Sequence, residues 1–477
     1  MICNDVLSKN PFTSNLINNV LQYKDVSKIT MLGIINNLLV YYLKSIVYLS
    51  HYIVKKIIHS FHNKKAFFIK INQDLIIIDT FLLVDDFKSR NSFRDNYFLG
   101  LDSFLNNSKE NFVYLPTLVG NKSFIDFNTI VKYSGVYENK IMLEQELLSY
   151  GDFIKMFFFI LNYPFRVLSF SLRLKKNNIV EEHLRNEMLL NIRYVSVQNY
   201  SRYLIGKQLA KIPWKKLKII SWYENQVIDK SFYKGIKDTN KDVKIIGAKP
   251  YVLSDEVLNE IPDENEILSG TLPDIILVNS YDQIPKETNL NYDVGPSLRY
   301  KALLETKLKF DNRTKILVML TIYDYEIRNV LNNIQKLDYP RKDILIKFHP
   351  TTKKQIYLNL VPNGVRIINE SLLDIYNTIK ITVGISTGAL IEAACLGIPC
   401  ILVPHPEKFS LKFFPKFGKG IIWDEVSEEN DINLILRKFN KKISLNNKEL
   451  LKMSQDYRHK YFLHPTIEDI SRAYLLN

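Results

Sequence analysis

The stretch that most constrains the fold of this chain is residues 379–404. An apolar run, Ile381–Val383, is followed by a small polar turn, Ser386–Gly388, and then by a segment of helical composition. A Gly-x-Pro turn leads from that segment into a second apolar run, Cys400–Val403. Strand, turn, helix, turn and strand in this order make a βαβ unit, in which a helix joins two parallel strands. We therefore expect a parallel α/β fold.

The same alternation of strand-like and helical segments runs from residue 214 to about residue 425. It is interrupted once, by Ser280–Gly295, which is rich in Asp, Asn, Pro and Gly and is typical of a linker. We expect a helix over Gln226–Lys237 and two Rossmann-like domains with a boundary near residues 280–300. The strand-like runs are Leu217–Ser221, Val243–Ile246, Ile275–Val278, Lys315–Leu320, Ile344–Ile346, Val365–Ile367, Ile379–Val383, Cys400–Val403 and Ile421–Ile422.

The first 210 residues have a different pattern. Residues 1–65 and 140–210 are helical in composition, and three strand-like runs lie between them: Ala66–Ile71, Leu75–Asp79 and Phe112–Leu115. The expected organisation is an N-terminal domain over residues 1–290, with its Rossmann-like part at 214–280, and a C-terminal Rossmann-like domain over residues 296–477.

The charge and cysteine content narrow the possible partners. The chain has 64 Lys and Arg against 50 Asp and Glu, a net charge of +14, which favours anionic partners. The positive charge is spread along the chain without a basic block interleaved with aromatic residues, so we expect no nucleic acid. The three cysteines form no CxxC or His-Cys cluster and no Asp-x-Asp motif ends a strand, so we expect neither a metal nor another cofactor.

Two apolar stretches are candidates for membrane contact. Residues 31–58 are rich in Leu, Ile, Val and Tyr but include Lys44, Lys55 and Lys56, and we expect an amphipathic helix that either packs in the fold or lies on a membrane surface. Residues 153–174 are followed by Lys175 and Lys176, and they predict either a buried helix or a helix docked on an anionic membrane. The first 28 residues are polar and mixed, so we expect no cleavable signal peptide. We expect a cytoplasmic protein, either free or peripheral at the inner face of the plasma membrane.

Two turns at strand ends predict a nucleotide site. A Ser386-Thr387-Gly388 turn that opens a helix presents hydroxyls and free backbone N–H groups to a phosphate, although Ser and Thr are also ordinary helix caps. Gly384 and Gly388 would let a ligand approach the backbone. His349, followed by Pro350, ends the preceding strand and would face the same crevice.

These motifs carry a family resemblance. The Lys347–Pro350 and Ser386–Gly388 turns are similar to the His-Pro and Ser/Thr motifs of bacterial sialyltransferases, polysialyltransferases, capsule Kdo transferases and CDP-glycerol glycerophosphotransferases. Trp222–Gln226 and Val294–Tyr300 resemble segments of GT-B-type surface carbohydrate (capsule and O-antigen) biosynthesis proteins. The resemblance covers residues 214–425 and implies a GT-B fold, with two Rossmann-like domains facing a cleft and an additional helical N-terminal region.

The resemblance also implies roles for individual residues on the donor side. His349 would contact the donor phosphate as the nucleotide leaves, with Lys347, Pro350 and the 384–388 turn around it. Lys347 is otherwise a solvated strand charge. Glu392 would bind a ribose hydroxyl, as carboxylates do in related folds, or belong to a surface or buried ion pair.

On the acceptor side, Glu224 would deprotonate the acceptor hydroxyl. The related families have two acids followed by Gly there, whereas this chain has Tyr223-Glu224-Asn225, and an ordinary helix-dipole role is the alternative. Asn225 and Gln226 would bind acceptor hydroxyls. Arg299 would contact an anionic group, unless it is merely solvated.

The expected function is transfer of a sugar, acidic and activated as a cytidine nucleotide, to a surface polysaccharide or glycolipid acceptor. Transfer of a polyol phosphate from a CDP-activated donor is the enzymatic alternative. A non-catalytic scaffold of GT-B fold in a polysaccharide assembly complex is the alternative from another class.

Overall fold

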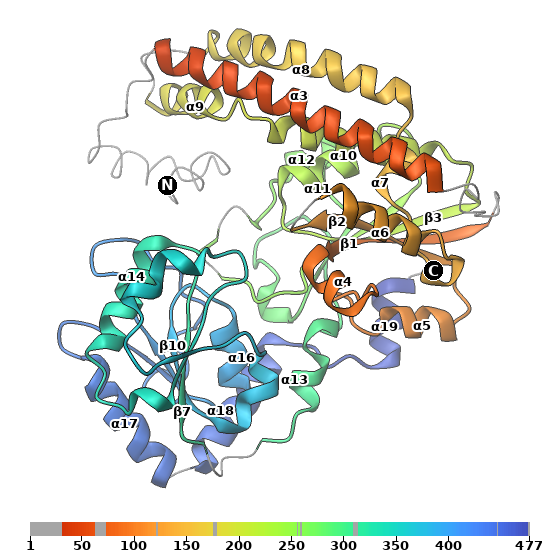
Figure 1. The fold of residues 1–477 in the computed structure, drawn as a ribbon. Coiled ribbons are helices and arrows are strands. Elements are labelled where there is room, and N and C mark those ends of the chain that lie inside the picture. Colours follow the sequence, from red (N-terminus) through yellow and green to blue (C-terminus); the bar gives the residue numbers. More distant parts are fainter. Residues whose placement is uncertain are drawn as a thin grey trace.

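Two parallel six-stranded sheets form the framework of the molecule (Figure 1). The computed structural model describes residues 31–62, 73–120, 123–174, 179–254, 256–257, 260–308, 313–445 and 447–475. The first sheet has the order β2-β1-β3-β4-β5-β6 and the second has the order β12-β11-β10-β7-β8-β9. The strands of the first sheet are β1 (Asp74–Leu83), β2 (Phe112–Val119), β3 (Lys216–Trp222), β4 (Lys244–Ala248), β5 (Ile275–Val278) and β6 (Tyr292–Val294). Those of the second are β7 (Lys315–Met319), β8 (Ile344–Lys347), β9 (Arg366–Ile367), β10 (Ile379–Gly384), β11 (Cys400–Leu402) and β12 (Trp423–Glu425).

The strands are continuous apolar runs because helices cover both faces of each sheet. Ile219 and Ile220 of β3, which point to opposite faces, are both fully buried. One face of the first sheet packs against long helices and the other against short ones, and each face has its own apolar core. The first layer contains α3 (Met31–His62), α7 (Glu144–Leu147), α8 (Tyr150–Ser171), α9 (Ile179–Leu190), α10 (Val195–Lys211) and α11 (Val227–Lys237). The second contains α4 (Val84–Arg90), α5 (Leu101–Asn107), α6 (Phe124–Ser134) and α19 (Ile467–Leu475).

Close packing of α10 on α11 ties the long-helix layer to the sheet. A Cβ atom at Gly206 would lie 2.3 Å from the Phe232 carbonyl oxygen, and one at Gly235 would lie 2.0 Å from the Tyr203 carbonyl oxygen. Only glycine lets the two backbones approach this closely. On top of this layer, α3 and α8 run along each other on the side away from the second domain (Figure 1), with the Tyr41 hydroxyl bonded to the Ile160 carbonyl at 3.2 Å.

The second sheet is covered by helices from the C-terminal half of the chain. They are α13 (Lys301–Glu305), α14 (Asp324–Gln335), α15 (Leu372–Ile375), α16 (Ala389–Cys395), α17 (Ile432–Leu445) and α18 (Asn447–Tyr461). α12 (Asn265–Ser269) belongs to the first domain, before β5. The two doubly covered parallel sheets and the additional N-terminal helices confirm the predicted GT-B-like α/β fold.

Several expectations about boundaries differ from the structure. The segment expected to be a linker contains β6, so the first sheet extends past residue 290. The last helix, α19, returns to the first domain, where Ile470 and Tyr474 join its core. The expected strand Ile421–Ile422 lies two residues later, at β12. The expected strand Ala66–Ile71 and the segment 1–30 lie outside the described residues.

Candidate functional site

The carboxyl edges of the two sheets contact each other through the loops that follow their strands. A Cβ atom at Gly388, after β10, would lie 3.2 Å from Val252, after β4. The Ser254 hydroxyl donates to the Lys412 carbonyl at 2.7 Å, and the Lys412 amide donates to Glu256 at 2.7 Å. In parallel α/β folds ligands bind at carboxyl edges, so the candidate site lies where these two edges meet.

Glu224 lies at the carboxyl end of β3, where the sequence placed it. Its two carboxylate oxygens accept hydrogen bonds from Trp222 Nε1 at 2.8 Å and from Gln226 Nε2 at 2.5 Å. The side chain is half-buried. Glu224 is thus an oriented carboxylate that can accept a proton from a bound hydroxyl.

The turn between Glu224 and α11 gives its other members structural roles. Asn225 has φ of 58° and is buried, and its side chain accepts a hydrogen bond from the Tyr223 hydroxyl at 2.9 Å. The expectation that Asn225 binds acceptor hydroxyls is therefore corrected: its side chain stabilises the turn. Gln226 is exposed and supports Glu224. Asp229 caps α11, accepting the Glu224 and Gln226 amides at 3.0 and 3.1 Å, and burial raises its pKa to about 7.

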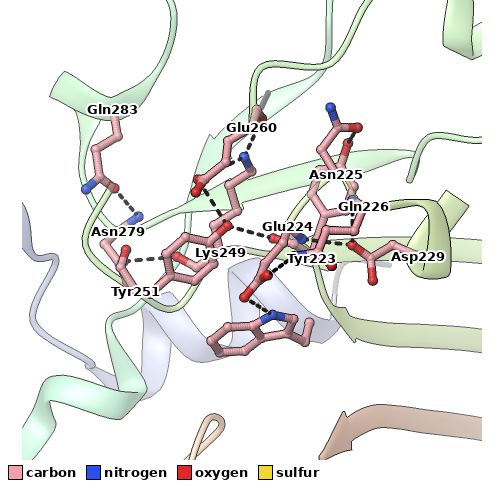
Figure 2. A network of polar contacts seen from close by, with 11 residues as sticks. Tyr223, Glu224, Asn225, Gln226, Asp229, Lys249, Tyr251, Glu260, Asn279 and Gln283 are labelled. Carbon is pink, nitrogen blue, oxygen red and sulfur yellow. Dashed lines mark hydrogen bonds and ion pairs between the residues drawn. The ribbon is translucent and has the colours of Figure 1, made fainter. Parts of the chain in front are cut away.

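A buried polar network surrounds Glu224 (Figure 2). Lys249, at the end of β4, is 3% exposed, and its ammonium donates to the Glu260 carbonyl at 2.5 Å and lies 3.8 Å from the Glu260 carboxylate. The Tyr251 hydroxyl lies 3.1 Å from the same carboxylate. Burial lowers the pKa of Lys249 to about 8, against the opposing charges of Glu260, Glu224 and Asp229. The first edge thus contains groups that exchange protons near neutral pH.

The sequence did not single out Lys249, Tyr251 or Glu260. The position of Lys249 in the sequence could have indicated it, because it follows the run Val243–Ile246 at the carboxyl end of a strand. No sequence pattern indicates Glu260, because it lies in a loop and comes close to Lys249 only in the folded protein.

On the second edge, His349 follows β8 as expected. Its Nδ1 accepts the Thr351 amide at 3.3 Å and lies 2.8 Å from the Thr351 hydroxyl, so the ring proton is on Nε2. Although the side chain is exposed, desolvation by the protein atoms around the ring lowers its pKa. A neutral imidazole with an outward Nε2–H can donate to a phosphate oxygen. Pro350 beside it is exposed.

Lys347, Glu392 and Arg299 form an electrostatic group between the two edges. The Lys347 ammonium donates to the Glu370 carbonyl at 2.5 Å, so it is more than a solvated strand charge. Burial raises the pKa of Glu392, while the positive charges of Arg299 and Lys347 oppose the rise. The Arg299 guanidinium lies over the rings of Tyr97 and Tyr300, 5.7 and 5.8 Å from their centroids. Within the described part of the chain, no hydrogen-bond partner is found for the Glu392 carboxylate, which leaves it able to accept one from a ligand.

The 384–388 turn differs from the expected phosphate cradle. Ser386 has φ of 50°, and its hydroxyl donates to the buried Glu326 at 2.6 Å and accepts the Leu411 amide at 2.9 Å. This hydroxyl is therefore committed to the fold. A Cβ atom at Gly384 would lie 2.5 Å from the Met319 carbonyl oxygen, and one at Gly388 would meet Val252, so both glycines make room for protein rather than for a ligand.

Thr387 keeps the predicted role open. Its hydroxyl accepts the Ala389 amide at the long distance of 3.4 Å, and the side chain is half-buried. The helix that follows, α16, is short. Among the residues that the structure describes, no group of three or more His, Cys, Asp or Glu side chains could hold a metal ion.

Comparison with known proteins yields likeness of fold only. No family model matches the chain, and no curated protein matches its sequence. The UDP-GlcNAc 2-epimerase from Neisseria meningitidis bound to UDP-GlcNAc is similar with a TM-score of 0.47 and 13% identity, over 85% of this chain and 100% of that one. The S. aureus MnaA–UDP co-structure has a TM-score of 0.46 and 11% identity, over 84% and 94%. The glycosyltransferase SnogD from Streptomyces nogalater has a TM-score of 0.40 and 9% identity, over 85% and 100%. Because these TM-scores are below 0.5, the assignment of the fold rests on the two sheets and not on these likenesses.

Proposed function

We propose that this protein is a glycosyltransferase that moves a sugar from a nucleotide donor to a polysaccharide or glycolipid acceptor of the cell surface. One observation carries the proposal: Glu224 and His349 end parallel strands of two different sheets whose carboxyl edges touch. A carboxylate on one edge and a hydrogen-bond donor on the other suit a reaction that removes a proton from one substrate and adds negative charge to the other.

In the proposed reaction, an acceptor hydroxyl attacks the anomeric carbon of the donor sugar. Its proton goes to Glu224 as the new glycosidic bond forms. The bond between the sugar and the phosphate breaks, and the electron pair stays on the leaving phosphate. His349 Nε2–H donates to a phosphate oxygen, and Glu392 accepts a ribose hydroxyl. The Lys249 ammonium lies near enough to Glu224 for the two charges to attract each other.

We propose an acidic sugar on a cytidine nucleotide as the donor, which follows from the His-Pro and Ser/Thr motifs and from the positive charge of the chain. The test is a thermal-shift panel of cytidine, uridine and adenosine nucleotides on wild type and His349→Ala. Cytidine nucleotides should raise the melting temperature of wild type. The variant should fold normally, because the His349 side chain bonds, within the described residues, only to Thr351 two positions later, and it should bind or transfer about tenfold to a thousandfold less well.

A matched control is His459→Ala, an exposed histidine on α18, which should respond to nucleotides as wild type does. Product analysis by mass spectrometry then separates sugar transfer from polyol-phosphate transfer. A protein that responds to no nucleotide would favour a non-catalytic scaffold and contradict the proposal.

We further propose that the protein is cytoplasmic and docks on the inner face of the plasma membrane through α3 and α8. Both helices are long and apolar enough to cross a membrane by length and composition, yet only 17% and 28% of their most apolar windows are buried. On α8, Phe157 and Phe158 are exposed rather than packed in the core. On α3, Leu43 is 67% exposed. The basic residues Lys175 and Lys176 lie outside the described residues.

Flotation with anionic liposomes tests this docking. The protein should float at low salt and less at high salt, because the Debye length falls from about 10 Å at 0.1 M to about 3 Å at 1 M. Replacing Phe157 and Phe158 by Ser should abolish flotation at an unchanged melting temperature. The exposed pair Tyr281→Ser and Ile322→Ser, far from α8 in the chain, serves as the control. Flotation that survives the Phe substitutions would contradict docking through α8.

A further inference from the structure

A cavity of about 490 Å³ lies in the first domain beside the end of β2, two strands away from β3 and Glu224. Its wall is made by α3, by the end of β2, by α7 and by α10, and it shares no residue with the candidate transfer site. The volume falls within the range of about 300–1,000 Å³ that is usual for small-molecule sites. The proposed mechanism makes no use of it.

Two charged groups in the wall of this cavity, Arg202 and Glu144, pair with each other, whereas Lys44 and His51 of α3 are exposed. Arg202 Nη2 donates to both carboxylate oxygens of Asp79, at 2.9 and 2.7 Å, and Nη1 lies 3.3 Å from Glu144. Glu144 also accepts the Tyr52 hydroxyl at 2.7 Å and the Thr117 hydroxyl at 3.2 Å. Because the guanidinium is already neutralised by two carboxylates, it offers little to an anionic ligand.

Two amides are among the polar groups of the wall that remain available. Gln145 is 4% exposed and lines the cavity, and within the described residues its side chain has no hydrogen-bond partner. Gln198, which is half-buried on the opposite wall, has an amide side chain in the same condition. Neither amide belongs to the fully buried polar atoms that lack a partner, so both can meet a ligand in the cavity. An amide both donates and accepts hydrogen bonds, and it pairs best with a ligand that does the same.

Aromatic rings complete the wall. Tyr48 lies with its ring centroid 5.7 Å from that of Tyr52 and 6.5 Å from that of Tyr194. The Tyr48 hydroxyl lies 3.3 Å from Ser201 Oγ. Tyrosine rings offer flat apolar faces with a polar rim, which match the C–H faces and hydroxyl groups of a sugar ring.

We infer that this cavity is a second saccharide site, which holds a non-reacting sugar residue of the acceptor. The inference rests on the proposed function for the nature of the ligand. It accounts for the amides and aromatic faces of the wall, beside which Lys44 and His51 of α3 are exposed. The cavity opens beside Leu43 and Val47, which are 67% and 56% exposed on α3, so the apolar part of a glycolipid acceptor could continue along that helix.

The test uses the full-length protein without nucleotide and three probes: methyl β-glucoside, methyl β-N-acetylglucosaminide and methyl β-glucuronide. Saturation-transfer NMR titrations should show that wild type binds at least one of them. Gln145→Met and Gln198→Met keep the side-chain volume but remove the amide. Each should weaken binding about fivefold or more, and neither should lower the melting temperature, because no hydrogen bond within the protein is lost. Gln335→Met, at an exposed glutamine of α14, is the control and should bind as wild type does.

Several results would overturn the inference. They are a wild type that binds none of the three glycosides, Met variants that bind as tightly as wild type, and Met variants that melt more than about 5 °C lower, since the amides would then be bonded within the fold. Hydrogen exchange on wild type gives an answer that needs no variant: the glycoside should protect amides of residues 143–147 and 195–202, and protection elsewhere alone would overturn the inference. Nucleotide binding that depends on His349, with no glycoside binding, would leave the proposed function intact and remove only the second site.

Discussion

The carboxyl edge of the first sheet buries its ionisable side chains, whereas that of the second sheet leaves its histidine exposed and ties its serine to the fold. Asp229 and Lys249 on the first edge have pKa values brought to about 7 and about 8 by burial. On the second edge, the His349 side chain has its hydrogen bonds within the described residues to Thr351, two residues away, and Ser386 holds Glu326 and Leu411 in place. The difference teaches that, under the proposed function, the first edge would take the proton and the second edge would bind the anion.

The largest expected effect tests the first edge. Glu224→Gln keeps the shape of the side chain and removes the basic oxygen, so donor binding should survive while transfer falls about a hundredfold to ten-thousandfold. Single-turnover kinetics with a saturating donor measure the loss. Glu305→Gln, an exposed residue of α13, should keep the wild-type rate. Normal turnover of the Glu224 variant would show that Glu224 is not the base and that the first edge does not take the proton.

A pair of neighbouring hydroxyls tests the second edge. Ser386→Ala removes the bond to the fully buried Glu326, so the free energy of unfolding should fall by about 1–3 kcal/mol with little change in nucleotide affinity. Thr387→Val should do the opposite, with little change in stability and about fivefold to tenfold weaker nucleotide binding. Denaturant unfolding and nucleotide titration of both variants separate the two effects. Nucleotide affinity lost in Ser386→Ala alone would mean that the motif binds phosphate through Ser386 after all.

The smallest expected effect is a change of slope with pH. Burial raises the folded-state pKa of Asp229 to about 7 from its usual value of 3.8. Between these values the folded protein binds more protons than the unfolded chain, so Asp229 makes stability fall as pH rises, by at most about 1.4 kcal/mol per pH unit. Asp229→Asn retains an oxygen for the two backbone amides and should flatten this fall in denaturant unfolding between pH 4.5 and 7. If the stability of the variant changed with pH as steeply as that of wild type, Asp229 would be ionised over this range and would hold no proton on the first edge.

The sequence predicted those parts of the fold and site that depend on neighbours in the chain. The strand runs, the helix Gln226–Lys237 and the positions of Glu224 and His349 follow from local pattern. β6 was missed because three residues, Tyr292–Val294, are too few to show a period. The role of Ser386 was missed because its partner, Glu326, lies 60 residues away in the chain. The same holds for Lys249 and Glu260, whose contact depends on a loop without a motif.

The return of α19 to the first domain has a mechanical consequence. The chain crosses between the domains at residues 295–300 and again at residues 462–466, and the two crossings are bonded to each other through Ser297 N and the Leu463 carbonyl at 2.9 Å. The Leu463 amide in turn donates to the Asn279 carbonyl at 2.7 Å. Two parallel tethers joined in this way resist twisting and sliding but permit bending, so the second domain can swing about a single axis along the crossings. Opening of the two edges by such bending would have to break the hydrogen bonds that join Lys412 to Ser254 and Glu256.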